Sequence, residues 1–94
     1  MFVDCESYED INNRVSEADK DGFVSPGYFN MRYGIARQVV HNWIKRDVLT
    51  AYRYEGKEGY FIFIPMSEVN RVYEERIKRI LARRKEKAAK QKNK

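Results

Sequence analysis

The spacing of apolar residues predicts a short helix, two helices joined by a tight turn, a β-hairpin and a long final helix. In residues 5–18 the apolar side chains follow each other at intervals of three and four, as on one face of a helix: Tyr8, Ile11, Val15 and Ala18. Ser7 with Asp10 three residues later resembles a capping box, and Gly22 is suited to end the segment. We therefore expect an N-terminal helix within residues 1–22.

Two further helices are predicted between residues 25 and 46. Ser25-Pro26 is a typical helix start, because Ser caps the first turn and Pro needs no hydrogen-bond acceptor at the first helical position. This helix is expected to end at Gly34, and after a three-residue turn a second helix covers residues 37–46. At 100° per residue, one side of the second helix carries Val40, Trp43 and Ile44, so we expect that side to be buried.

A hairpin and the last helix follow. Residues 48–54 alternate apolar and polar side chains, EGKEG (55–59) is a charged turn bracketed by glycine, and YFIFI (60–64) is a second strand. Ser67 is expected to cap the last helix, whose apolar stripe is Val69, Tyr73, Ile77 and Ile80. Because the stripe is long for so small a domain, we expect its end to be covered by the acidic N-terminal helix or by a second copy of the chain.

This order of elements predicts a mainly α fold with a small β-hairpin, in the layout of a winged helix–turn–helix. We expect an acidic N-terminal helix (1–22), a winged helix–turn–helix with its C-terminal helix (23–82) and a disordered basic tail (83–94).

Composition excludes several kinds of site. A single cysteine, Cys5, and a single histidine, His41, leave no intramolecular disulfide and no zinc cage of the usual kind. The acidic start does not resemble a signal peptide, and no apolar run approaches the roughly 18 residues of a membrane span. No nucleophile–base pair or glycine-rich phosphate loop is evident. We expect a cytoplasmic protein, not an enzyme, with no cofactor and no membrane partner.

The net charge of +5 is unevenly distributed. Residues 1–22 carry seven acids and two bases, residues 23–82 carry six acids and ten bases, and residues 83–94 carry one acid and seven bases. A basic middle and tail indicate a polyanionic partner. The acidic start has two interpretations: it packs on the core as an extra helix, or it competes with DNA for the basic surface.

The polar side of the helix at 37–46 suits the major groove of DNA. Amide side chains can bond adenine, a lysine can reach guanine, and a histidine can bond a base edge or a phosphate. The candidate base-reading residues are Gln38, His41, Asn42 and Lys45. The candidate phosphate contacts are Arg37 and Arg46 on this helix and Arg53 and Lys57 in the hairpin.

Residues 23–72 resemble the MerR-like winged helix–turn–helix of phage excisionases and small phage or plasmid regulators. The resemblance is carried by Gly34 to Gln38, Val40 to Arg46, Ala51 to Arg53, Ile64-Pro65 and Ser67 to Val69. It implies that the protein binds double-stranded DNA, with the second helix in the major groove and the hairpin as a wing on the backbone. It also implies dimers or cooperative arrays. The sequence departs from the family pattern at Ala36, where a capping Ser is usual, and at Asp47, where Gly is usual.

The sequence therefore favours a sequence-specific duplex DNA-binding protein, either a small transcriptional regulator or an excisionase-like architectural factor of a phage or plasmid. Two alternatives stay open. One is a DNA-binding component of packaging or plasmid partition, and the other is a protein–protein interaction module on the same fold.

Overall fold

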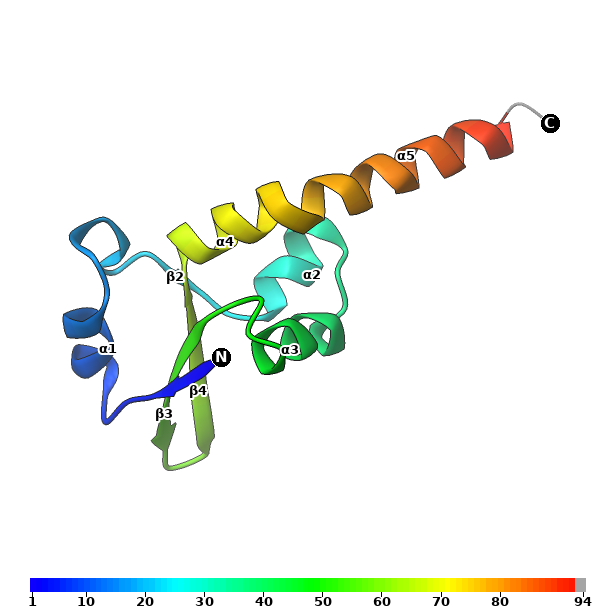
Figure 1. Cartoon of the computed structure of the whole chain (residues 1–94). Coiled ribbons are helices and arrows are strands. Elements are labelled where there is room, and N and C mark those ends of the chain that lie inside the picture. The colour runs from blue at the N-terminus through cyan, green and yellow to red at the C-terminus, as the bar shows by residue number, and fades with distance from the viewer. Residues whose placement is uncertain (93–94) are drawn as a thin grey trace.

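The computed structural model describes the backbone of residues 1–92 and the side chains of residues 1–88. Its elements are β1 (Phe2–Asp4), α1 (Tyr8–Arg14), a 3₁₀ turn (Glu17–Asp19), β2 (Phe23–Val24), α2 (Gly27–Tyr33), α3 (Arg37–Lys45), β3 (Ala51–Gly56), β4 (Gly59–Pro65), α4 (Met66–Val72), a π-helical turn (Tyr73–Ile77) and α5 (Lys78–Lys92). The chain is mainly helical around a small sheet of order β1-β3-β4-β2, and α5 extends away from the body (Figure 1).

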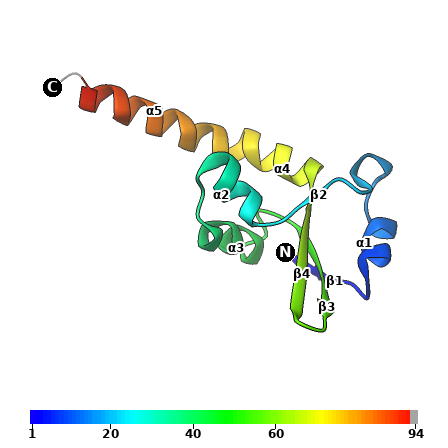
Figure 2. The same ribbon diagram turned by 180° about the vertical axis from the view of Figure 1, so that it is seen from behind.

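The sheet separates α1 from the other helices (Figures 1 and 2). In the hairpin Arg53 lies opposite Ile62 and Tyr54 opposite Phe61, so successive residues face opposite layers. Ala51 and Ile64 join the main core, whose other members come largely from the helices: Phe29, Ile35, Val40, Trp43, Ile44, Leu49, Val69, Val72 and Ile77. On the other face, the Tyr8 ring of α1 lies 5.5 Å from the Phe63 ring, and Ile11 is fully buried.

The predicted hairpin is confirmed, and its first strand begins three residues later than expected. The N–H groups of Val48 and Leu49 both donate to the Trp43 carbonyl, so these residues close the end of α3 rather than pair in the sheet. Gly56 pairs with Gly59, which leaves Lys57-Glu58 as a two-residue turn. A Cβ at Gly56 would collide with the Phe61 ring, so a larger residue here would have to displace that ring.

Strand β1 was not predicted. It pairs in parallel with β3, with Phe2 beside Ala51 and Asp4 beside Arg53. The Met1 nitrogen donates to the carbonyls of Ile44 and Leu49, which attaches this strand to the end of α3. Three residues give too short a pattern to reveal a strand, and a parallel partner is far away along the chain.

The predicted N-terminal helix starts as expected and ends early. Ser7 Oγ accepts from the Asp10 N–H at 3.1 Å, which confirms the cap. The helix stops at Arg14 instead of Ala18, because Val15 is extended. A 3₁₀ turn then carries Asp19 to the start of α4.

The expectation that Ser67 caps the last helix was wrong. Ser67 lies inside the first turn of α4, and its N–H and hydroxyl donate to Asp19 at 3.1 and 2.6 Å. Asp19, 48 residues earlier, therefore caps this helix. The expected Ser25 cap of α2 is likewise not seen among the described residues, where the Ser25 carbonyl accepts from the Tyr28 N–H instead.

A π-helical turn connects α4 to α5. It places Val72 and Ile77 on one side, and both are fully buried. The helix then continues to Lys92, so residues 83–92 are helical where the sequence predicted a disordered tail. The last two residues of that predicted tail, 93 and 94, lie outside the described part.

The end of the apolar stripe is covered within the chain, by α2 and α3. Ile80 and Leu81 pack against the core, and the Tyr33 and Tyr73 rings are 5.6 Å apart. The Arg84 guanidinium donates to the carbonyls of Tyr33 and Gly34 at 2.8 and 3.1 Å, which fastens α5 to the end of α2. Within the chain, the covering elements are therefore α2 and α3 and not the N-terminal helix, and further cover by a second copy in a homodimer stays a prediction.

Candidate nucleic-acid interface

The turn between α2 and α3 has the expected form. Gly34 adopts the left-handed conformation (φ 65°), and its N–H donates to the Asn30 carbonyl at 2.9 Å. Ile35 turns inward and is buried. Ala36 precedes α3 without a side-chain cap, as its methyl side chain dictates. Asp47, after α3, adopts φ 63°, the left-handed conformation that glycine adopts most readily.

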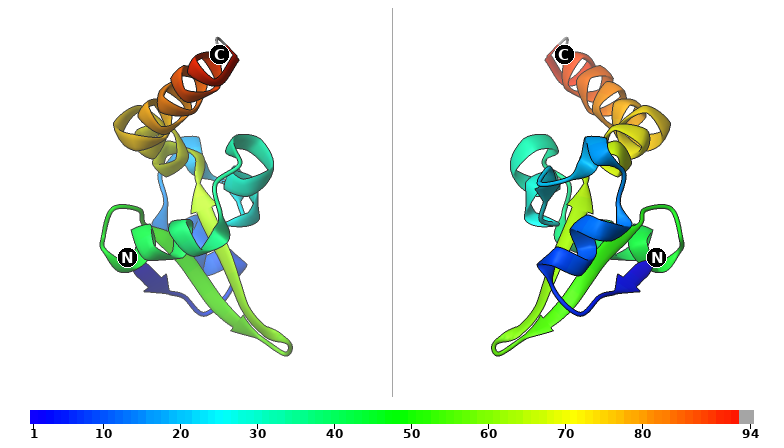
Figure 3. Two further views of the ribbon diagram at one scale, coloured as in Figure 1. Left: turned by 90° about the vertical axis from the view of Figure 1, so that its right-hand side faces the viewer. Right: turned by 90° about the vertical axis from the view of Figure 1, so that its left-hand side faces the viewer.

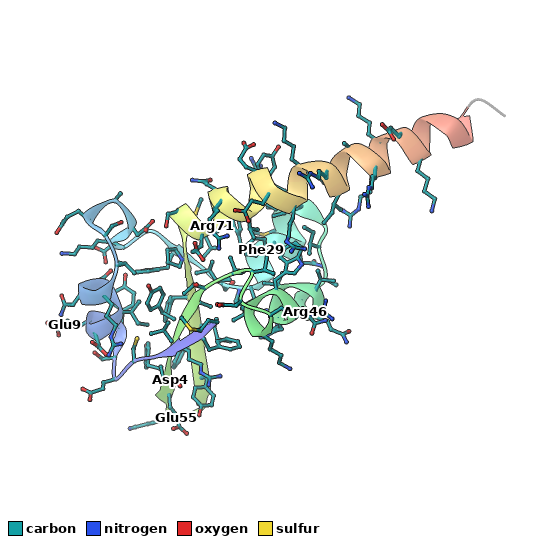
Figure 4. The ribbon with its side chains drawn as sticks, viewed as in Figure 1. Asp4, Glu9, Phe29, Arg46, Glu55 and Arg71 are labelled. Atoms are coloured by element: carbon teal, nitrogen blue, oxygen red, sulfur yellow. The ribbon has the colours of Figure 1, made fainter. Side chains whose placement is uncertain are left out.

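Helix α3 has a buried and an exposed side. Val40, Trp43 and Ile44 are buried, as the sequence predicted. The opposite side is exposed and carries Gln38, Asn42, Lys45 and Arg46. These four side chains make no hydrogen bond or ion pair with the described residues, so their polar atoms are available to a partner. Figure 4 shows Arg46 on this helix, away from α1.

His41 lies at the edge of this exposed side. It is half-buried, and its ring centroid is 6.2 Å from that of Phe2 on β1. Arg37 lies near it, with its guanidinium over the start of α2: a Cβ added at Gly27 would be 3.1 Å from Arg37 Nη2. Both residues line a hollow of about 360 Å³ between α3, the start of α2 and strand β4. Of the candidate residues on α3, Arg37 and His41 line this hollow, whereas Gln38, Asn42 and Lys45 do not.

Arg53 already has partners within the chain. Its guanidinium pairs with Asp4 and lies between the rings of Phe2 and Tyr60, at 4.5 and 4.9 Å from their centroids. The hydrogen bond from Arg53 lowers the pKa of the Asp4 carboxyl, so this pair is charged at neutral pH. A phosphate contact by Arg53 would have to compete with Asp4.

The tip of the hairpin is aromatic rather than basic. Lys57 is exposed in the turn, as predicted, but Glu55 and Glu58 are exposed beside it. Tyr60 and Phe61 are 59% and 48% exposed. The hairpin thus offers one lysine between two acids, next to two exposed rings.

Sequence reasoning missed a second basic surface, which we call the α5 arginine row: Arg76 in the π-helical turn before α5, and Arg79 and Arg83 on α5. These residues line a hollow of about 300 Å³ between α5 and α3, together with Val39, Trp43, Ile80 and Glu75. The spacing of three and four between the arginines was the available signal, because it places them on one face of a helix.

The charged groups are arranged differently on the two sides of the sheet. On the α1 side, arginine and lysine side chains pair with nearby acids, as in Arg14–Asp10 and Lys20–Glu17. Figure 4 shows Glu9 at this end of the molecule. On the α3 and α5 side, several cations make no ion pair with any described residue, among them Arg37, Lys45, Arg46, Arg76, Arg79 and Arg83.

No protein-family model, curated protein or solved structure matches this chain. Within residues 1–92, every helix is too short or too polar to cross a membrane.

Proposed function

We propose that α2, α3 and the β3–β4 hairpin form a winged helix–turn–helix, and that the protein binds double-stranded DNA in a sequence-specific way. One observation carries the proposal: the exposed side of α3 presents Gln38, Asn42, Lys45 and Arg46 with no partner among the described residues. Side chains of this kind on one helical face match the donor and acceptor pattern of the major groove.

The roles follow from position. Gln38 and Asn42 point outward and suit bidentate bonds to adenine, and Lys45 suits the acceptors of guanine. Arg46, at the end of α3, suits a phosphate. Arg37 and His41 line the hollow beside the hairpin, so they suit the backbone at the edge of the groove better than a base.

Residues 23–72 resemble excisionases and small regulators of phages and plasmids. We therefore propose that this DNA binding serves a regulatory or architectural role in the cytoplasm. The exposed Tyr60 and Phe61 at the hairpin tip favour a second candidate, binding of a protein partner through the hairpin. The two functions share part of one surface, because Tyr60 and Phe61 line the same hollow as Arg37 and His41.

The test is selection of bound duplexes from a random pool at near-physiological salt, with wild type and two matched variants. Asn42→Ala removes a candidate base contact on α3, whereas Asn70→Ala makes the same change at an exposed position on α4. We expect Asn42→Ala to weaken binding to the selected site by roughly 1–3 kcal/mol and to relax one position of the motif. Asn70→Ala should keep both affinity and motif.

The absence of an enriched motif with wild type would reject sequence-specific binding. Equal loss from Asn42→Ala on selected and random duplexes would show that α3 does not read bases.

A further inference from the structure

The α5 arginine row lies beside the exposed side of α3. Arg76, Arg79 and Arg83 line the hollow between α5 and α3, and Val39 and Trp43 form its α3 wall. In Figures 1 and 3, α5 runs above α3, and the hairpin points away from it. The row therefore flanks α3 on the side opposite the hairpin tip.

The row is positively charged and held in place. Glu75 also lines the hollow, but its carboxylate accepts from Arg71 at 3.1 Å. The neighbouring Arg84 has a structural role. It donates to the carbonyls of Tyr33 and Gly34 and so fastens α5 to α2. This attachment keeps the row at a fixed position relative to α3.

The hairpin is a weak source of phosphate contacts. Arg53 is paired with Asp4, and Lys57 lies between Glu55 and Glu58. A protein that inserts α3 into a major groove needs cations on the flanking backbone, and Arg76, Arg79 and Arg83 supply three without ion pairs on the α5 side.

We propose that Arg76, Arg79 and Arg83 bind the sugar–phosphate backbone of the duplex, on the side of α3 away from the hairpin. This inference rests on the proposed function. From Arg76 to Arg83 the helix rises by about 10 Å. One DNA strand places a phosphate at about every 3.4 Å of axial rise, so the row is long enough for successive phosphates.

The experiment compares two charge-matched double variants of the full chain on the selected duplex. Arg79→Gln/Arg83→Gln removes two cations from the row. Lys78→Gln/Lys85→Gln removes two cations from the opposite face of the same helix, where Lys78 pairs with Glu74. We expect the row variant to bind the selected duplex roughly tenfold more weakly, with the motif unchanged. The slope of log affinity against log salt should become shallower by about two, because two phosphate contacts are lost. The control variant should lose much less.

A third variant, Arg79→Lys/Arg83→Lys, keeps the charge and should bind within a few-fold of wild type. Thermal unfolding of all variants verifies that the fold is retained, since these side chains are exposed. Equal losses from the row and the control variants would overturn the inference and assign the effect to overall charge. A changed motif would also overturn it, because backbone contacts carry no sequence information.

The two proposals fail in distinguishable ways. If wild type selects no duplex, the proposed function is rejected and this inference with it. If wild type selects a motif that depends on Asn42, while the row variant matches the control, the row alone is rejected.

Discussion

At the scale of single residues, Asp19 connects the N-terminal segment to the start of α4. It is 7% exposed, and its carboxylate accepts from the Ser67 N–H, the Ser67 hydroxyl and the Ser16 hydroxyl. These bonds satisfy one of the free N–H groups at the start of α4 and place a negative charge near the helix dipole. The segment before the sheet is therefore part of the folded structure.

We expect Asp19→Ala to lower the free energy of unfolding at pH 7 by about 1–3 kcal/mol, because it leaves the part-buried Ser67 N–H without its acceptor. The Ser67 hydrogen bond lowers the pKa of Asp19. Its stabilisation is therefore fully present above the unfolded pKa of about 4 and is lost as pH falls through the lower folded pKa. Urea unfolding at pH 7, 5 and 3 should show the difference between wild type and variant shrinking below pH 4.

Glu9→Ala is the control, because Glu9 lies exposed on α1 and its side chain has no bonding partner among the described residues. It should change stability by less than about 0.5 kcal/mol. A difference for Asp19→Ala that is constant from pH 7 to pH 3 would show that its carboxylate is not the stabilising group.

At the scale of elements, Gly34 sets the angle between α2 and α3. Its φ of 65° is unfavourable for any side chain, and an added Cβ would lie 3.2 Å from Arg84 Nη1. We expect Gly34→Ala to destabilise the protein by about 1 kcal/mol or more and to loosen α5 from α2. Gly22→Ala is the matched control, because a Cβ there meets nothing closer than 3.6 Å. Equal midpoints of urea unfolding for the two variants would refute this role of Gly34.

The elements also show which parts of the fold can be predicted from sequence. The helix pair, the hairpin and the buried side of α3 depend on local signals: Gly34, the charged turn and the spacing of Val40, Trp43 and Ile44. Strand β1 and the Asp19 cap depend on partners 48 or more residues away, so no local pattern reveals them.

The candidate site likewise has a part that the sequence predicts and a part that it does not. The exposure of Gln38, Asn42, Lys45 and Arg46 follows from the helical wheel. The surroundings of His41 and Arg53 do not, because both side chains lie against β1: His41 near Phe2, and Arg53 on Phe2 and Asp4. One unpredicted strand of three residues therefore accounts for both differences.

At the scale of the whole molecule, the first interpretation of the acidic start agrees with the structure, because this segment packs on the core, whereas competition with DNA stays a prediction. The sheet lies between α1 and α3, and the N-terminal segment packs through Ile11, Tyr8 and Asp19 (Figures 1 and 2). Deleting this segment would remove structural contacts, so a loss of DNA binding after deletion would say nothing about competition. Neutralising its exposed acids is the sharper test.

We expect Glu6→Gln/Glu9→Gln to change duplex affinity by less than about twofold at physiological salt, because charges separated by more than the Debye length of about 8 Å are largely screened. Both side chains are exposed, and Figure 4 shows Glu9 on the α1 side of the sheet, away from α3. The measurement is a titration of the selected duplex at two salt concentrations. The hairpin variant Glu55→Gln/Glu58→Gln is titrated in the same way for comparison. The hairpin variant should bind more tightly, since those acids flank Lys57 on the proposed wing. A tenfold gain from Glu6→Gln/Glu9→Gln would instead mean that the acidic start reaches the DNA-binding surface, and that the segment leaves its place behind the sheet.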